Sequence, residues 1–225
     1  MRNSGNVVRR PISSQQQDRP ASGEWVRVWH GKGGKMIKQL FIDTETTGVN
    51  TDIVGMYQVG GIIRVGKREE EFEFNCDIFE EDEIDPKAFE KNGLTLKEIA
   101  TFPTPQDTFE KFINLLDKYI DRYDKKDKFI VIGYGAEFDQ RILSNWFYKL
   151  GDDYFRSWFW HPWIDVMNLA MYVVKDYRSD ISSFKLKSIA EHFHIRTDDT
   201  KLHTALYDAQ ITRKIYNKLE HYINS

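Results

Sequence analysis

Residues 38–48 read KQLFIDTETTG, an apolar run that ends in two carboxylates. Three consecutive apolar residues start at Leu40, a pattern typical of a strand covered on both faces. Asp43 and Glu45 lie two residues apart, so in a strand their side chains share one face. The sequence therefore predicts two carboxylates side by side at the end of its most apolar strand.

The rest of the chain predicts an α/β fold with a mixed sheet. Three strands come first, then helices alternate with strands, and helices close the chain, which is typical of a sheet flanked by helices. A turn at Gly66-Lys67-Arg68 predicts a hairpin between the second and third strands. The further strands are expected at Tyr57–Val65, Glu69–Ile78, Phe129–Ile132 and Trp163-Ile164, and the helices at Thr108–Tyr119, Ala136–Tyr148, 165–175, 184–192 and 205–222.

Length and composition exclude several classes of protein. The chain has 225 residues, 40% of them hydrophobic, which is too much apolar surface for a disordered protein. The single cysteine, Cys76, excludes an intrachain disulfide and a multi-cysteine zinc site. No apolar run approaches the ~20 residues of a membrane helix, and residues 1–20 lack the apolar region that is typical of a secretory signal. We expect a cytoplasmic protein with no membrane partner.

Charge divides the chain into two segments. Residues 1–35 are polar, low in complexity and carry +5, so we predict a disordered or flexible extension. Residues 36–225 form the predicted domain and carry −8. A nucleic-acid-binding domain usually has the opposite sign. Either the domain avoids polyanions, or bound cations neutralise some of its carboxylates.

Two further acidic residues occupy the apolar faces of predicted helices. Asp139 lies in the first turn of its helix, in line with the apolar stripe. Asp208 has the same relation to the apolar stripe of the last helix. The stripes comprise Ile142, Leu143, Trp146 and Leu150 in the first case, and Ile211, Ile215, Leu219 and Tyr222 in the second.

Each of these carboxylates alone has a simpler explanation. Asp43 and Glu45 can point into water at a strand end, and Asp139 can complement a helix dipole. Four carboxylates from three elements, all directed toward the core, are explained together by a shared divalent-cation site. Oxygen ligands of this kind suit Mg²⁺ or Mn²⁺.

His203 is the histidine that bears on this site. It lies five residues before Asp208, so the two cannot share a helix face. Thr204 suits the N-cap position, which places His203 in the loop just before the helix. From there its ring can reach the carboxylates and change protonation near neutral pH.

Five short motifs, in order, resemble those of the DEDDh exonucleases, the superfamily of ribonuclease T, oligoribonuclease and the bacterial proofreading subunit. The resemblance covers about 37–222, and each motif alone has low specificity. The motifs are FIDTETTG at 41–48, GLT at 93–95, AEFD at 136–139, WID at 163–165 and HTALYD at 203–208.

The resemblance implies a ribonuclease H-like fold, with a mixed five-stranded sheet flanked by helices, and a two-metal 3′→5′ exonuclease. Such an enzyme releases nucleoside 5′-monophosphates from single-stranded DNA or short RNA, in DNA repair or RNA processing. By this analogy Asp43 bridges two Mg²⁺ or Mn²⁺ ions, Glu45 and Asp208 bind the nucleophile-side ion, and Asp139 holds the second. His203 would take the proton from the attacking water.

The resemblance also suggests substrate contacts and shows two departures. Thr46, Thr47 and Phe138 are expected near the terminal nucleotide. Gly135 stands where the family often has Asn, and Gln58 where it often has Glu. Both departures concern positions around the metal site or the substrate, so they bear on the substrate more than on the chemistry.

The first partner that the sequence suggests is the 3′ end of a single-stranded nucleic acid. A homodimer or an association with a polymerase is left open. The alternative function is a non-catalytic nucleic-acid-binding or polymerase-accessory module with the same fold. Six aromatic residues could form a base-stacking platform, although we expect at least half of them to be core. They are Tyr154, Phe155, Trp158, Phe159, Trp160 and Trp163.

Deletion of residues 1–35 is predicted to leave a folded, active enzyme, because this segment precedes the first recognisable strand. Melting curves and cleavage assays on the two lengths of chain test this. An insoluble product would show that the extension packs on the core. Weaker substrate binding would instead show that its +5 charge contacts nucleic acid.

Overall fold

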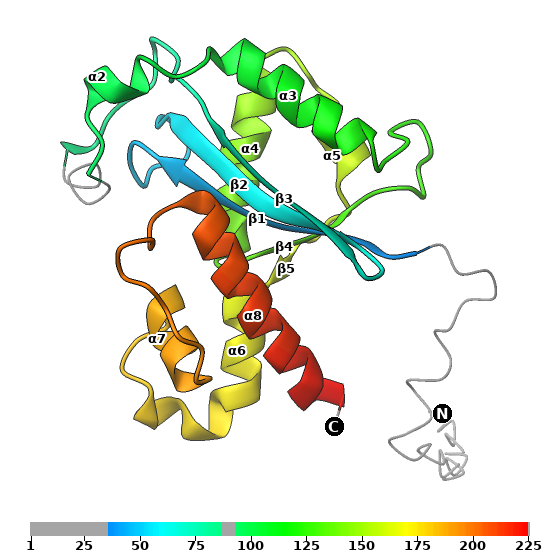
Figure 1. The fold of residues 1–225 in the computed structure, drawn as a ribbon, viewed down its shortest axis with the longest axis vertical. Coiled ribbons are helices and arrows are strands. Elements are labelled where there is room, and N and C mark those ends of the chain that lie inside the picture. The colour runs from blue at the N-terminus through cyan, green and yellow to red at the C-terminus, as the bar shows by residue number, and fades with distance from the viewer. Residues whose placement is uncertain (1–35, 87–92, 225) are drawn as a thin grey trace, which may run out of the picture. The chain divides into compact units, whose positions relative to one another are not determined.

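The computed structural model describes residues 36–86 and 93–224, and their central feature is a five-stranded sheet of order β3-β2-β1-β4-β5 (Figure 1). The predicted extension at 1–35 lies outside the described residues. Strand β1 pairs antiparallel with β2 and parallel with β4, which confirms the mixed sheet. The strands are β1 (Lys38–Thr46), β2 (Met56–Val65), β3 (Arg68–Asn75), β4 (Ile130–Gly133) and β5 (Ile164–Asp165).

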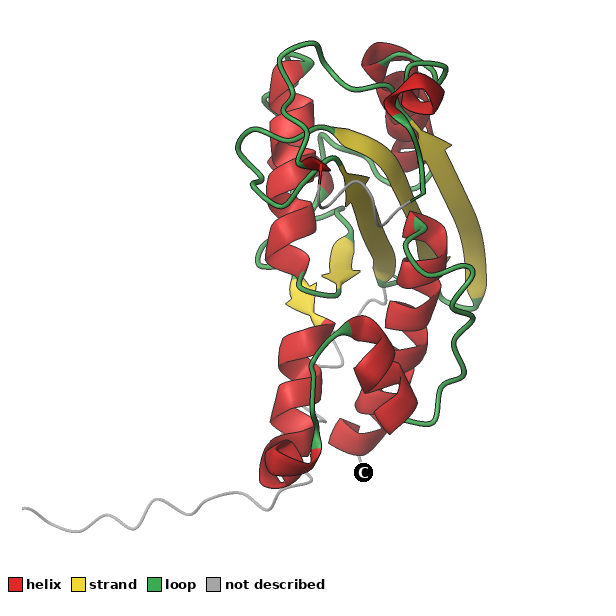
Figure 2. Cartoon of the chain, turned by 90° about the vertical axis from the view of Figure 1, so that its left-hand side faces the viewer, coloured by secondary structure: helices red, strands yellow, loops and turns green. Residues whose placement is uncertain are grey.

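Helices cover both faces of this sheet (Figures 1 and 2). One layer consists of α3 (Pro105–Asp117), α4 (Ala136–Lys149) and the short α5 (Phe155–Trp158). The other consists of α6 (Val166–Val174), α7 (Leu186–His192) and α8 (Ala205–Asn224). Two further short helices are α2 (Leu96–Ile99) and the 3-10 helix η1 (Lys175–Asp180). Within the described ranges no helix is long and apolar enough to cross a bilayer.

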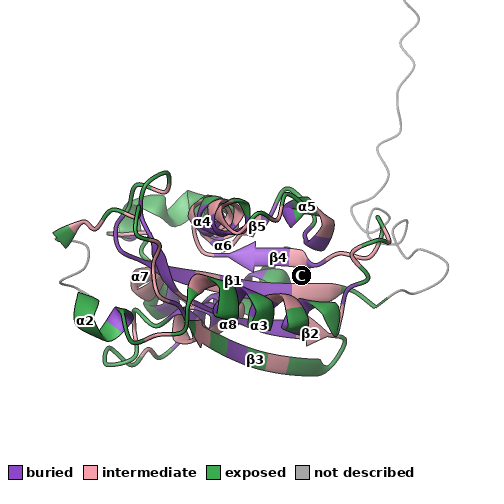
Figure 3. Cartoon of the chain, turned by 90° about the horizontal axis from the view of Figure 1, so that it is seen from above, coloured by how far each residue is buried: buried purple, intermediate pink, exposed green. Residues whose placement is uncertain are grey.

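Side chains of successive residues in β1 point into opposite layers, because the strand is pleated. Leu40 and Ile42 belong to the core beneath α3, α4 and α5. Phe41, between them, belongs to the core beneath α6, α7 and α8. All three are fully buried, in keeping with a strand covered on both faces (Figure 3). The same alternation continues into the residues that end the strand.

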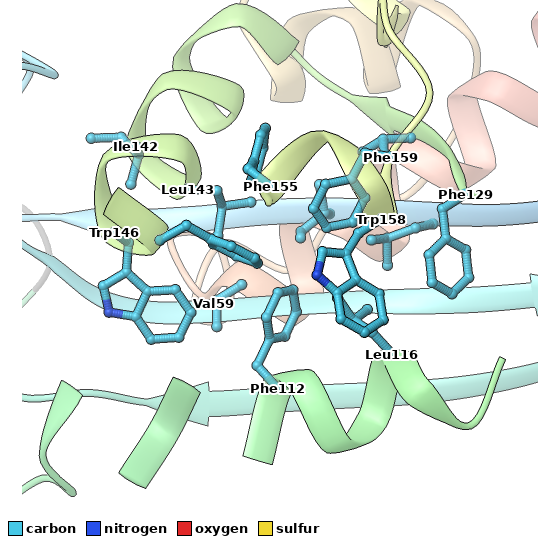
Figure 4. Packing of buried hydrophobic residues seen from close by; sticks show 14 of the residues in the cluster. Val59, Phe112, Leu116, Phe129, Ile142, Leu143, Trp146, Phe155, Trp158 and Phe159 are labelled. Carbon is cyan, nitrogen blue, oxygen red and sulfur yellow. The ribbon is translucent and has the colours of Figure 1, made fainter. Parts of the chain in front are cut away.

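The α3 side of the sheet holds a core rich in aromatic rings (Figure 4). Phe112 of α3 lies 6.0 Å from Trp146 of α4, measured between ring centroids. Four of the six clustered aromatics expected after α4 are buried, so the prediction that at least half are core is confirmed. The buried ones are Phe155, Trp158, Phe159 and Trp163, whereas Tyr154 and Trp160 are exposed.

Several predicted boundaries need correction. The sequence predicts the first strand at Lys38–Asp43, and β1 continues three residues further, to Thr46. Strand β3 ends at Asn75 because the N–H of Asp77 donates to the carbonyl of Pro103 and leaves the sheet. Tyr222, placed by its spacing on the apolar stripe of α8, is 59% exposed because the last turn extends beyond the core. The hairpin at Gly66 forms as predicted, with φ of +61° at the glycine.

Candidate metal centre

Three of the four predicted metal ligands meet at the end of β1. Oxygens of Asp43, Glu45 and Asp208 all lie within 4.8 Å of one another. Asp43 and Glu45 share the β1 face that α8 covers, because they follow Phe41 at intervals of two residues. Asp208 reaches them from the first turn of α8. The strand period and the helix position together produce the cluster.

The cluster has the donor chemistry of a hard divalent cation. Three carboxylates from two elements converge in a partly buried place, where each needs a positive partner. Oδ1 of Asp208 is buried and has no hydrogen-bond partner among the described residues. A buried acceptor of this kind is rare in folded proteins, and a bound cation would satisfy it. The residues therefore fit a metal site.

The fourth predicted ligand, Asp139, comes from the opposite layer. It lies in the first turn of α4 and is only 3% exposed. Its Oδ1 accepts hydrogen bonds from the backbone N–H and the hydroxyl of Thr44, at 2.9 and 2.8 Å. Thr44 lies between Asp43 and Glu45 and so points to the α4 side of β1. Asp139 is thus held against the strand end that carries two of the other carboxylates.

Two supporting residues fix the start of α4. Gly135, directly before the helix, has a φ of +71°, a region that glycine adopts most readily. Its N–H donates to Oδ1 of Asp165 at 3.0 Å, and the same oxygen accepts from the N–H of Met167. Asp165 ends β5, so a single carboxylate joins the starts of α4 and α6. Sequence reasoning gave neither Thr44 nor Asp165 this supporting role.

Electrostatics make the metal-free cluster unfavourable. Burial, followed by the charges of Asp139, Glu45 and Asp208, raises the pKa of Asp43 well above its usual value. Burial is also the main cause that raises the pKa of Glu45 to about 8, of Asp139 to about 7 and of Asp208 to about 6. For Asp208, the charge and the backbone N–H of His203 act in the opposite direction. The charge of His203 offsets only part of the rise in the pKa of Asp208, and a bound cation would supply further positive charge to the cluster.

His203 lies where the sequence places it, in the turn two residues before α8 begins. It is exposed and has a φ of +70°, which is uncommon for a residue other than glycine. Thr204 has the N-cap position, since its carbonyl accepts from the N–H of Asp208. The capping side chain, however, is not that of Thr204, because its hydroxyl donates to the carbonyl of Lys201.

The three predicted substrate contacts have different surroundings. The Thr47 side chain is fully buried; its hydroxyl donates to the carbonyl of Glu83 and accepts from the N–H of Gly55. The hydroxyl of Thr46 donates to the carbonyl of Gly48. Phe138 is partly exposed and lines an open hollow of about 610 Å³ together with Gly135, Arg141 and Asp165. Their contacts with substrate stay predictions.

The family follows from a comparison with known sequence families. A family model described as Exonuclease (RNase_T) matches residues 40–216, most of the chain. This chain belongs to that exonuclease family. The match confirms the resemblance to the DEDDh exonucleases and makes the protein a nuclease of the hydrolase class. A comparison with curated proteins gives no match.

Solved structures of exonuclease I share the fold. The product-bound structure has a TM-score of 0.63 and 18% identity, over 84% of this chain and 46% of that one. Escherichia coli exonuclease I in complex with a dT13 oligonucleotide has a TM-score of 0.61 and 20% identity, over 82% and 40%. The zinc-bound E. coli exonuclease I–ssDNA complex has a TM-score of 0.63 and 19% identity, over 84% and 43%. The chain spans less than half the length of these proteins, and the shared fold confirms the predicted ribonuclease H-like class.

The metal-free protein is predicted to lose stability as pH rises from about 4 to about 8. Over this range the folded state retains protons on its raised carboxyls that the unfolded chain has released, so the free energy of unfolding falls. Asp43→Asn should therefore melt several degrees above wild type at pH 8 in EDTA, where ~1 kcal/mol corresponds to about 2–4 °C. Mg²⁺ should raise the melting temperature of wild type much more than that of the variant.

The matched control is Asp117→Asn, which changes an exposed aspartate on α3. It should melt like wild type in both conditions. An Asp43→Asn variant that melts below wild type in EDTA at pH 8 would contradict the repulsion among these carboxylates.

Proposed function

We propose that this chain is a two-metal-ion 3′→5′ exonuclease that releases nucleoside 5′-monophosphates from single-stranded DNA or short RNA. The carrying observation is the cluster of Asp43, Glu45 and Asp208 at the end of β1, with Asp139 held beside it by Thr44. A module that only binds nucleic acid gains nothing from concentrating carboxylates at one place, since they repel phosphates.

The two cation sites would draw on these four residues. Asp43, Glu45 and Asp208 would hold one Mg²⁺ or Mn²⁺ ion, and Asp43 together with Asp139 would hold the second. Bound there, the ions supply charge stabilisation to the attacking and leaving oxygens of a phosphodiester. Thr44 fixes one oxygen of Asp139, which leaves the other oxygen of that carboxylate for a metal.

His203 is the proposed general base. His203 is exposed, and its charge acts on the Asp208 carboxylate. In this proposal its imidazole accepts a proton from a water that attacks the terminal phosphate. The charge and the backbone N–H of His203 oppose the rise in the pKa of Asp208, so the two residues lie close enough to interact. Because His203 is exposed, it can take a proton from the water and then release that proton to solvent.

The open hollow lined by Phe138 and Arg141 is the proposed place for the terminal nucleotide. Phe138 offers a ring on which a base can stack, and Arg141 a charge for a phosphate. Thr46, the last residue of β1, and Thr47, which follows it, are the other proposed contacts of the terminal nucleotide. The exonuclease I structures with dT13 and with ssDNA support a single strand as the substrate class. DNA and RNA are both kept as substrates.

The deciding assay uses a 5′-labelled single-stranded oligonucleotide, in DNA and RNA form, with Mg²⁺ or with EDTA. The proposal predicts a ladder that shortens from the 3′ end in Mg²⁺ and no cleavage in EDTA. Asp43→Asn, which removes a shared ligand, should abolish the ladder, whereas Asp117→Asn should not change it. Internal cleavage, or an unchanged ladder with Asp43→Asn, would refute the proposal.

His203→Ala should cleave about 10²–10⁴-fold more slowly than wild type, as is typical for loss of a general base. The wild-type rate should rise with pH as the imidazole loses its proton, and the variant should lack this dependence. Binding of Mn²⁺ should persist, because the four carboxylates remain. The test is a pH–rate profile of both proteins at saturating Mg²⁺; a variant that keeps both the rate and the profile would exclude His203 as the base.

A further inference from the structure

The start of α8 is held by the sheet rather than by its own loop. The first N–H groups of a helix have no partner within the helix and need acceptors elsewhere. Here the N–H of Ala205 donates to Oε1 of Gln58 on β2 at 2.8 Å. The N–H of Leu206 donates to Oε1 of the more exposed Glu73 on β3 at 3.2 Å. Two side chains more than 130 positions away in sequence therefore cap this helix.

The helix also lies in direct contact with the β2 backbone. A Cβ added at Gly60 would lie 2.4 Å from the backbone nitrogen of Leu206 and 2.8 Å from the carbonyl carbon of Ala205. No side chain fits between the strand and the helix at this point. Contact between the two backbones thus sets the height of α8 above the sheet. The two caps fix the position of its N-terminal end.

Gln58 is itself fixed in orientation. Its Nε2 donates to Oδ1 of Asn75 on β3 at 2.8 Å, so its Oε1 faces the helix. Gln58 is also paired across the sheet with Glu45 of β1. A single residue therefore pairs through its backbone with the strand that ends in the carboxylates and bonds through its side chain to the helix that carries Asp208.

The segment next to these caps is under backbone strain. His203, two residues before Ala205, has a φ of +70°. A residue other than glycine stays in this region only when its surroundings hold it there. The caps on Ala205 and Leu206, the two residues at the start of α8, supply that restraint.

We propose that Gln58 is a positioning residue for the His203–Asp208 segment, with Glu73 as a second support. Gln58 contacts no reacting atom in this assignment; it acts by fixing the helix start from which His203 and Asp208 project. The inference rests on the proposed function only in the role of His203. The placement of the helix can be measured without any activity.

Three variants test the positioning role. Gln58→Met has a similar length and lacks the acceptor, whereas Gln58→Glu keeps an acceptor and favours a helix N-terminus by charge. Gln210→Met is the matched control, because Gln210 bonds from α8 to Glu71 of β3, beyond the helix start. All three change one sheet–helix contact. Their melting temperatures show whether each variant is folded.

The first readout is hydrogen–deuterium exchange of residues 203–208 in the metal-free protein. Gln58→Met should speed exchange of the Ala205 amide, whereas Gln58→Glu and Gln210→Met should leave it near the wild-type rate. The second readout is kcat and KM for the single-stranded oligonucleotide at saturating Mg²⁺. Gln58→Met should lower kcat by about 10- to 100-fold, since misplacing a catalytic group is costly, and leave KM within about twofold.

The two proposals fail separately. Wild type without activity would refute the exonuclease proposal, and the exchange measurement would still decide the positioning of α8. Active wild type with full kcat in Gln58→Met would overturn the positioning role. Equal loss in Gln58→Met and Gln210→Met would overturn it as well, because any sheet–helix contact would then suffice. A kcat for Gln58→Glu as low as that for Gln58→Met would also overturn the positioning role.

Discussion

Repulsion among four carboxylates is the constraint on which this molecule depends. Asp43, Glu45 and Asp208 converge within 4.8 Å, and burial adds to the repulsion by removing water. Few folded proteins tolerate such a group without a positive partner. The surrounding structure is organised to hold these side chains in place despite this cost, with Thr44 bonded to Asp139 and the sheet bonded to the start of α8.

The pleat of β1 explains how two layers contribute to one site. Odd-numbered residues from Phe41 to Glu45 face α8, whereas Thr44 faces α4 and bonds to Asp139. Each helix then needs only one acidic residue in its first turn at the end of the strand. The arrangement requires a strand that is covered on both faces, and the apolar run from Leu40 is what provides it.

Much of this was predictable from sequence because it depends on local periodicity. The strand pattern around Leu40 and the helical stripes of Asp139 and Asp208 predicted the sheet and the convergence of acidic residues. What depends on contacts between distant elements was not predictable. Thr44 reads as an ordinary strand residue until α4 is placed beside it. The caps from Gln58 and Glu73 to α8 depend on the strand order and on the height of the helix above the sheet, which no local pattern specifies. The sequence therefore predicts a capping side chain at Thr204, whereas side chains of the sheet cap the helix.

In the part of the chain that the structure describes, the two hydrophobic cores on either side of the sheet share no helix. The acidic cluster is a point at which a side chain of the α4 layer approaches side chains that face the α8 layer. A cation coordinated by Asp139 and Asp43 together would act as a crosslink between the layers, in the way that a disulfide joins distant parts of a chain. Metal binding in this fold would then oppose the separation of α4 from α8, so the ions proposed for catalysis would also make the two layers unfold as one unit.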